Sequence, residues 1–226
     1  MIHAGGLIIL EGEKADESTI ELASPAFMCR SVADAALLLN VLADAKTSQS
    51  EFKNDFSPAF ATTKNPRLGI VNNFTATDEI RTAFSNAVET FRSLGCAISE
   101  VKVPFEKASF DVKNIEQDRN TIAETLFKDI DVLLLPTIAE LTLTIEEAQK
   151  REKSKAENSV AFSPNNTFFC NYYGLPAISV PCGFDKNGLP LGLQIVGRQW
   201  DEGKVLDMAN RYQKATQWHL KHSSVA

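Results

Sequence analysis

The 226-residue sequence has no excess of positive charge and no CxxC pair of cysteines, and each absence excludes a class of protein. Lysine and arginine number 23 against 29 acidic residues, a formal net charge of −6, which argues against general binding to nucleic acid or to an anionic membrane. The four cysteines are scattered and form no CxxC pair, so neither a disulfide framework nor a zinc knuckle is expected. We interpret them as buried, reduced thiols, which favours a cytoplasmic protein.

Long apolar runs and familiar catalytic motifs are missing as well. No apolar segment approaches the roughly 20 residues that cross a bilayer, and the apolar start of the chain lacks the basic residues of a signal peptide. No HExxH, EF-hand, P-loop or GxSxG motif occurs. Two of the three histidines, His219 and His222, lie near the polar end of the chain. A pair without a third ligand predicts no metal site, and we expect no cofactor.

What the sequence does contain is typical of a globular protein. Hydrophobic residues make up 44% of the chain and charged residues 23%, which excludes global disorder. A chain of this length can bury enough surface to fold without disulfides or metals. The length fits one large domain or two small ones, and we predict a single domain over residues 1–226.

Residues 67–104 have the pattern of a βαβ unit. A short apolar run at 68–71 is followed by helix-capping residues and then by apolar residues at i, i+3, i+4 spacing as far as Gly95. The segment 97–103 is strand-like and is closed by Pro104. Such a unit predicts two parallel strands joined by a right-handed crossover.

Residues 131–218 are predicted to complete the sheet and to end in a helix. The apolar run 131–136 is typical of a strand buried on both faces, as in a parallel sheet covered by helices. Two further strands, 177–181 and 191–197, flank an Asn-Gly turn at residues 187–188, which predicts an antiparallel pair. The expected fold is therefore α/β, with a mixed β-sheet flanked by helices on both faces.

Other helices are indicated by their first residues or by charge spacing. Ser31 and Asp34 predict a capped helix start, and the apolar helix that follows is expected to be deeply packed. Residues 45–66 are predicted to form a polar surface connection, and Asp201 is predicted to cap the last helix. Residues 146–157 hold four acids and four bases, which favours a solvated helix over a binding role. Its i, i+4 pairs are Glu146–Lys150 and Glu147–Arg151.

Five motifs follow one another along the chain. They are Cys29-Arg-Ser-Val-Ala-Asp-Ala-Ala36, Asp131-Val-Leu-Leu-Leu-Pro-Thr137, Asn171-Tyr-Tyr-Gly-Leu-Pro-Ala-Ile-Ser-Val-Pro-Cys-Gly183, Gly188-Leu-Pro-Leu-Gly-Leu-Gln-Ile-Val-Gly-Arg198, and Asp201-Glu202 with an amphipathic helix that ends at Ala215-Thr-Gln-Trp-His219. Together they resemble the C-terminal half of the amidase signature family, the serine amidases that include the amidase subunit of glutamyl-tRNA amidotransferases. Each motif alone is weak, but five in the right order are specific, and they span nearly the whole chain.

The resemblance implies hydrolysis of a carboxylic amide C–N bond by a serine, a cis-serine and a lysine. In the family these residues and the oxyanion hole lie in an N-terminal half with Gly/Ser-rich segments, and this sequence has no Gly-Gly-Ser-Ser-Gly run. The resemblance therefore assigns no catalytic residue here and implies a truncated amidase that is inactive alone. Two further departures support this expectation. First, only a short helix fits between Pro104 and Asp131, where the family has a long helical insertion. Second, the family has a Gly-Pro pair closer to the motif arginine than Ser24-Pro25 is to Arg30 here.

Four residues are predicted to help bind substrate: Pro136, Thr137, Asn171 and Gly174. A strand that ends in Pro-Thr turns a hydroxyl outward at the carboxyl edge of a sheet, where open α/β sheets bind ligands. Asn171 offers an amide that both donates and accepts, and Gly174 permits close approach of the backbone. Simple strand termination also explains Pro136 and Thr137, and a loop cap also explains Asn171, so both interpretations stay open.

Two other side chains of this region are predicted to be structural. Ser179 lies between two apolar strand residues, which predicts a buried hydroxyl bonded to the backbone rather than a nucleophile. Cys182 has no histidine nearby in the sequence to activate it, which predicts an inert thiol.

Two functions of different classes stay open. In the first, the chain supplies the pocket floor and the sheet edge of an amidase, and a small-molecule amide binds once an N-terminal half completes the site. In the second, the chain is a non-catalytic interaction or binding module, because unpaired strand edges bind a second copy or a partner chain. A weaker third hypothesis, a ligand-binding domain around residues 67–135, lacks the Gly-rich loop that a nucleotide would need. No nucleic-acid or membrane partner is expected.

Overall fold

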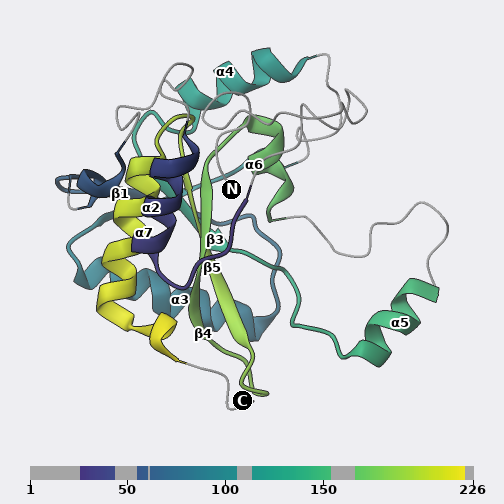
Figure 1. Cartoon of the computed structure of the whole chain (residues 1–226). Coiled ribbons are helices and arrows are strands. Elements are labelled where there is room, and N and C mark those ends of the chain that lie inside the picture. Colours follow the sequence, from purple (N-terminus) through teal and green to yellow (C-terminus); the bar gives the residue numbers. More distant parts are fainter. Residues whose placement is uncertain (1–25, 44–54, 61, 106–113, 154–165, 222–226) are drawn as a thin grey trace.

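A mixed sheet of five strands forms the centre of the computed structural model, which describes residues 26–43, 55–60, 62–105, 114–153 and 166–221 (Figure 1). The strand order is β2-β1-β3-β5-β4. Strand β1 is parallel to both β2 and β3, whereas β5 is antiparallel to β3 and β4, so the predicted mixed sheet is confirmed. The strands are β1 (Arg67–Val71), β2 (Ala97–Val101), β3 (Val132–Pro136), β4 (Ala177–Phe184) and β5 (Pro190–Gly197).

The predicted βαβ unit is confirmed by the parallel pairing of β1 with β2. The helix between them is α3 (Asp78–Ser93), whose apolar face is buried at the expected i, i+3, i+4 spacing. The helix stops at Gly95, which takes the positive φ of +80° that ends a helix without steric cost. The central strand β3 is buried along its whole length, as its continuous apolar run predicts.

Helices cover both faces of the sheet, as expected. Figure 1 shows α2 (Val32–Leu42) and α7 (Glu202–Thr216) side by side on one face, which α3 also covers. Gly197 of β5 faces this side, because a Cβ built there would lie 2.6 Å from the Val205 side chain of α7. The helices α4 (Ile115–Thr125) and α6 (Phe168–Tyr173) pack on each other at the other face.

The start of α2 agrees with the sequence, but its burial does not. The Ser31 hydroxyl accepts the Asp34 N–H at 3.1 Å, and the Asp34 carboxylate accepts the Ser31 N–H at 3.2 Å, which is the predicted capping box. The expectation of deep packing is wrong. Only Val32, Ala35, Ala36 and Leu39 are buried, because α2 packs through one face against α7. An apolar stripe of four residues stays exposed: Leu37, Leu38, Val41 and Leu42.

The charged helix is α5 (Ile145–Lys153), which projects away from the sheet (Figure 1). The Glu146–Lys150 pair is confirmed at 2.7 Å. The predicted Glu147–Arg151 pair is wrong, because Glu147 accepts the Thr144 N–H at 2.8 Å and so caps the helix start. Arg151 instead pairs with Glu140 at 2.6 Å.

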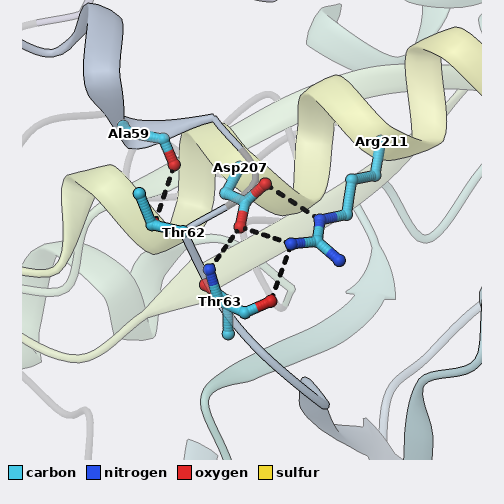
Figure 2. A network of polar contacts seen from close by, with 5 residues as sticks. All are labelled: Ala59, Thr62, Thr63, Asp207 and Arg211. Carbon is cyan, nitrogen blue, oxygen red and sulfur yellow. Dashed lines mark hydrogen bonds and ion pairs between the residues drawn. The ribbon is translucent and has the colours of Figure 1, made fainter.

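The connection before β1 is not confined to the surface, contrary to the prediction for residues 45–66. Within its described part, Phe56 and Ala59 are fully buried, Ala59 in the short helix η1 (Ser57–Ala59). This segment is held to α7 by Asp207, which accepts the Thr63 N–H at 3.0 Å and pairs with Arg211 (Figure 2). Residues 45–54 and residue 61 of the connection lie outside the described residues.

The end of the chain follows the predicted order. The β4–β5 turn is closed by Asp185, whose carboxylate accepts the Asn187 and Leu189 N–H groups at 2.8 Å each, with Gly188 at a φ of +78°. Asp201 is the N-cap residue of α7, but its carboxylate makes no cap hydrogen bond and pairs with Lys204 at 3.0 Å. A short helix, η4 (Trp218–Leu220), follows α7. Among the described residues, no helix combines the length and the apolar character needed to span a bilayer.

Candidate functional site

Two hydroxyl groups from different strands meet at the carboxyl end of β3. Pro136 is the last residue of β3, and the Thr137 N–H still donates to the Gly192 carbonyl of β5 at 2.9 Å. This bond fixes the Thr137 side chain beside β4, where its Oγ1 lies 2.7 Å from the Ser179 Oγ. Thr137 is half-buried and Ser179 is exposed, so the pair is accessible to a ligand or to another polypeptide.

Gly192 makes this contact possible because it has no side chain. A Cβ built at Gly192 would lie 2.8 Å from Ser179 Oγ and 2.8 Å from Thr137 Oγ1, closer than any real Cβ contact. Thr137 directly follows β3, Ser179 lies in β4 and Gly192 in β5, and we call these three residues the hydroxyl platform.

The hydroxyl platform lies on the sheet face opposite to α7. Gly192 precedes Gly197 by five residues in β5, and side chains alternate between faces along a strand, so the two glycines face opposite sides. Gly197 faces α7. Ser179 is paired with Gln194, which is two residues beyond Gly192 and therefore on the same face as the platform.

Gln194 fixes the loop beside the platform through a buried polar relay. Its Nε2 donates to the Asn166 carbonyl at 2.6 Å. The Asn166 side chain then forms two hydrogen bonds with the Thr75 backbone, accepting its N–H at 3.3 Å and donating to its carbonyl at 2.8 Å. Gln194 and Asn166 are both buried, so these bonds are shielded from water. The relay ties the sheet to the loop that follows β1.

Asn171 and Gly174 lie in a different environment from Pro136 and Thr137. Asn171 belongs to α6, and Gly174 ends that helix at a φ of +64°. The Arg119 guanidinium donates to the Tyr172 carbonyl at 2.9 Å and to the Asn171 carbonyl at 3.4 Å. A Cβ at Gly174 would meet Arg119 at 3.4 Å and Gln199 at 3.7 Å rather than the hydroxyl platform. The four predicted site residues therefore form two groups.

The interpretation of Ser179 as a buried, backbone-bonded hydroxyl is wrong. Ser179 is exposed, and its hydrogen bond goes to the Thr137 side chain directly after β3. Gln194 and Gly192 are not among the predicted site residues. A signal for Gln194 is present in the sequence, since a polar residue within an apolar strand must have a buried partner.

Three of the four cysteines are buried, and Cys29 is exposed. Burial raises the pKa of Cys182 to about 12, so this residue is a neutral thiol at pH 7, in agreement with the prediction. Cys96 and Cys170 are also buried. The expectation of burial is wrong for Cys29, which is exposed just before α2. No group of three or more potential metal ligands occurs among the residues that the structure describes.

The hydroxyl platform can bind, but it lacks what a nucleophile needs. A serine or threonine hydroxyl attacks a carbonyl only when a neighbouring base removes its proton. Among the described residues, no lysine or histidine side chain hydrogen-bonds to Thr137 or Ser179. Each hydroxyl carries one hydrogen and two acceptor lone pairs, so the pair still offers one donor and several acceptors. This is the capacity of a docking point for a polar group or a backbone segment.

Sequence comparison matches the same region. Residues 109–206 match the model of the Amidase family. One glutamyl-tRNA(Gln) amidotransferase subunit of Nostoc sp. is 37% identical over 103 residues, and the corresponding protein of Brevibacillus brevis is 41% identical over 105 residues. These alignments cover 46% and 45% of this chain but only 20% of each relative. The chain thus matches about a fifth of the length of these curated relatives.

Solved structures share the fold over a larger part of the chain. A 6-aminohexanoate cyclic dimer hydrolase complexed with substrate has a TM-score of 0.72 at 18% identity, and the match covers 86% of this chain and 55% of the hydrolase. A bacterial aryl acylamidase of the amidase signature enzymes has a TM-score of 0.70 at 19% identity, and that match covers 97% of this chain and 58% of the acylamidase. At such identities the likeness shows the fold alone.

Proposed function

We propose that this chain, whose residues 109–206 match the Amidase family, forms the scaffold side of a site that hydrolyses a small-molecule carboxylic amide. In this proposal the nucleophilic serine, the second serine and the lysine come from a segment that corresponds to the N-terminal half of the family. The present chain supplies the sheet end against which that segment lies, and it does not hydrolyse amides by itself.

The hydroxyl platform is the observation that carries the proposal. It is an accessible polar point at the carboxyl end of β3, where open α/β sheets place their ligands. Gly192 has no side chain, so the backbone of a catalytic loop can approach the sheet closely. Thr137 and Ser179 can hydrogen-bond to that loop and so hold a nucleophile in position.

Asn171 and Gly174 form a second side of the substrate pocket in the same proposal. Arg119 donates to the Tyr172 and Asn171 carbonyls near the end of α6 and so fixes the turn at Gly174. Since a charged side chain holds this turn in addition to its apolar packing, we assign Arg119 a positioning role. The groups that contact substrate at this side are the Asn171 amide and the Gly174 backbone.

We also propose a partner that pairs with β4 and a cytoplasmic location for the chain. Strand β4 is an edge of the described sheet, and a partner segment or a second copy that pairs with it would satisfy the outward backbone groups. We place the chain in the cytoplasm, a reducing compartment, because its four cysteines are all unpaired and Cys29 is exposed.

A chimera tests the scaffold role. Residues 67–221 replace the matching segment of the bacterial aryl acylamidase, and hydrolysis of an aryl acylamide is measured. We expect a folded, active chimera, and no hydrolysis by the present chain alone. Replacing both hydroxyls, Thr137→Val with Ser179→Ala, should lower kcat by about tenfold or more, the effect of losing one or two positioning hydrogen bonds.

The matched control removes a hydroxyl on α4. Thr121→Val deletes an exposed hydroxyl that bonds within its own helix, to the Gln117 carbonyl at 2.8 Å, and should leave kcat unchanged. A folded chimera without activity would refute the scaffold role. Equal activity with and without the two platform hydroxyls would refute the part assigned to Thr137 and Ser179.

A further inference from the structure

A cavity of about 460 Å³ lies on the α3 and α7 side of the sheet, away from the hydroxyl platform. It is lined by α3, by Phe184 at the end of β4, by Tyr212 of α7 and by Trp218 of η4. None of the three platform residues lines it. Its volume is that of a site for a small organic molecule.

The aromatic wall of this cavity already contacts an ammonium group. The Phe184 and Trp218 rings meet edge to face, with centroids 5.8 Å apart. The Lys221 amino group lies 5.3 Å from the Phe184 centroid and 4.9 Å from the Trp218 centroid. Both distances are within the range of a cation–π contact, so the electron-rich rings are placed to receive positive charge.

The threonine hydroxyls of the cavity can accept hydrogen bonds but have no hydrogen left to donate, and the Asn86 amide in the same lining both accepts and donates. Three threonine hydroxyls line it, and each already donates its only hydrogen to the carbonyl four residues earlier in its own helix. These bonds are Thr82 to Asp78 at 2.9 Å, Thr90 to Asn86 at 3.1 Å and Thr216 to Tyr212 at 2.9 Å. What remains at each hydroxyl is acceptor capacity, so a ligand that fits must bring donors.

The charge of the lining also favours a positively charged ligand. Among the described residues that line the cavity, Glu79 is the only acidic or basic side chain, and one of its oxygens accepts the Lys186 N–H at 2.7 Å. Cys182 and Tyr212 also line the cavity, and burial raises the pKa of each, that of Cys182 to about 12, so both are neutral at pH 7. The cavity therefore combines one carboxylate, threonine acceptors, the Asn86 amide and aromatic faces.

We propose that this cavity binds a primary organic ammonium ion with an apolar body. The ammonium group lies against Glu79 and the threonine oxygens, and the apolar body lies against Phe184 and Trp218. A carboxylate and hydroxyl acceptors are partners that an ammonium ion prefers, and aromatic rings pack well against an apolar body. This site does not depend on the amidase role, since it is on the other face of the sheet and involves none of the platform residues.

Tryptophan fluorescence of the full chain tests the site. The sequence holds two tryptophans, so the Trp200→Phe variant leaves Trp218 as the only one. We expect cyclohexylmethylammonium chloride to change the Trp218 emission with saturation, and the neutral cyclohexylmethanol to bind at least about tenfold more weakly, because it lacks the charge. Glu79→Gln should weaken ammonium binding by about tenfold, the loss of one charge-assisted contact.

The matched control is Glu89→Gln, which removes an exposed carboxylate further along α3 that pairs with Arg92 and should leave the affinity unchanged. Amide chemical shifts of the unsubstituted chain provide a second measurement that is independent of the tryptophan variant. Saturable shifts at Thr82 and Phe184 support the site. Equal affinity for the alcohol, equal affinity after Glu79→Gln, or shifts that cluster elsewhere would each overturn the proposal.

Discussion

Asp207 holds Arg211, one turn further along α7, by two contacts, with Oδ1 2.9 Å from Nε and Oδ2 3.0 Å from Nη2 (Figure 2). Asp207 is fully buried, and the same Oδ2 accepts the Thr63 N–H while Arg211 donates to the Thr63 carbonyl at 2.7 Å. The ion pair therefore binds both backbone groups of one residue just before β1. It couples the last helix to the first strand of the sheet.

Removing Asp207 should be costly because its partners stay behind. Asp207→Ala leaves the Arg211 charge and the Thr63 N–H without their acceptor, and we expect a loss of about 3–5 kcal/mol in the free energy of unfolding. Urea denaturation measures the loss. The control, Glu89→Ala, breaks an exposed pair with Arg92 and should change stability by less than about 1 kcal/mol. Similar costs for the two variants would mean that the network of Figure 2 does not anchor α7.

Gly192→Ala tests the close approach of the two platform hydroxyls. The added methyl group would meet both oxygens at 2.8 Å, so either the strand or the hydroxyls must move. We expect a loss of about 1–3 kcal/mol in the free energy of unfolding, the usual cost of overpacking. In a Thr137→Ala, Ser179→Ala background the oxygens are gone and the same substitution should cost less. A cost that stays the same in both backgrounds would place the strain elsewhere.

The sequence could predict those features that depend on residues close together in the chain. The βαβ unit follows from the apolar spacing of α3 between two short strands, and the β4–β5 hairpin follows from an Asn-Gly turn. The Ser31–Asp34 capping box is likewise local. Each of these signals operates over a few residues, where backbone geometry and capping chemistry decide the outcome.

The hydroxyl platform could not be predicted in the same way. Thr137 and Ser179 are 42 residues apart, and they meet because β5 inserts between β3 and β4 in one register. The exposure of Ser179 depends on what covers its face of β4, which the local sequence does not encode. The prediction of deep burial for α2 is wrong for a related reason, since an apolar helix does not reveal which of its faces has a partner.

The buried thiol of Cys182 predicts a loss of stability at alkaline pH. Burial raises its pKa from about 9 to about 12. Between these values the unfolded chain releases the proton and the folded chain keeps it, so the free energy of unfolding falls as the pH rises. Cys182→Ala should flatten this fall between about pH 9 and about pH 11, as measured by urea denaturation. The exposed Cys29, replaced by alanine, is the control, and equal slopes for both variants would contradict the assignment.

The exposed stripe of α2 makes a prediction that separates surface from core on one helix. Leu37 and Val41 are 59% and 80% exposed, whereas Leu39 is 3% exposed. Replacing Leu37 and Val41 by lysine should change the free energy of unfolding by less than about 1 kcal/mol, whereas Leu39→Ala should cost about 2–5 kcal/mol.

An apolar stripe on the surface also favours association, so sedimentation velocity should show less self-association after the lysine substitutions than before them. If these substitutions instead destabilise the chain as much as Leu39→Ala does, the stripe is covered in solution. The helix would then contribute both of its apolar faces to the core. In that case α2 would be as deeply packed as its composition suggested, and the partner that covers it would have to be part of the folded state.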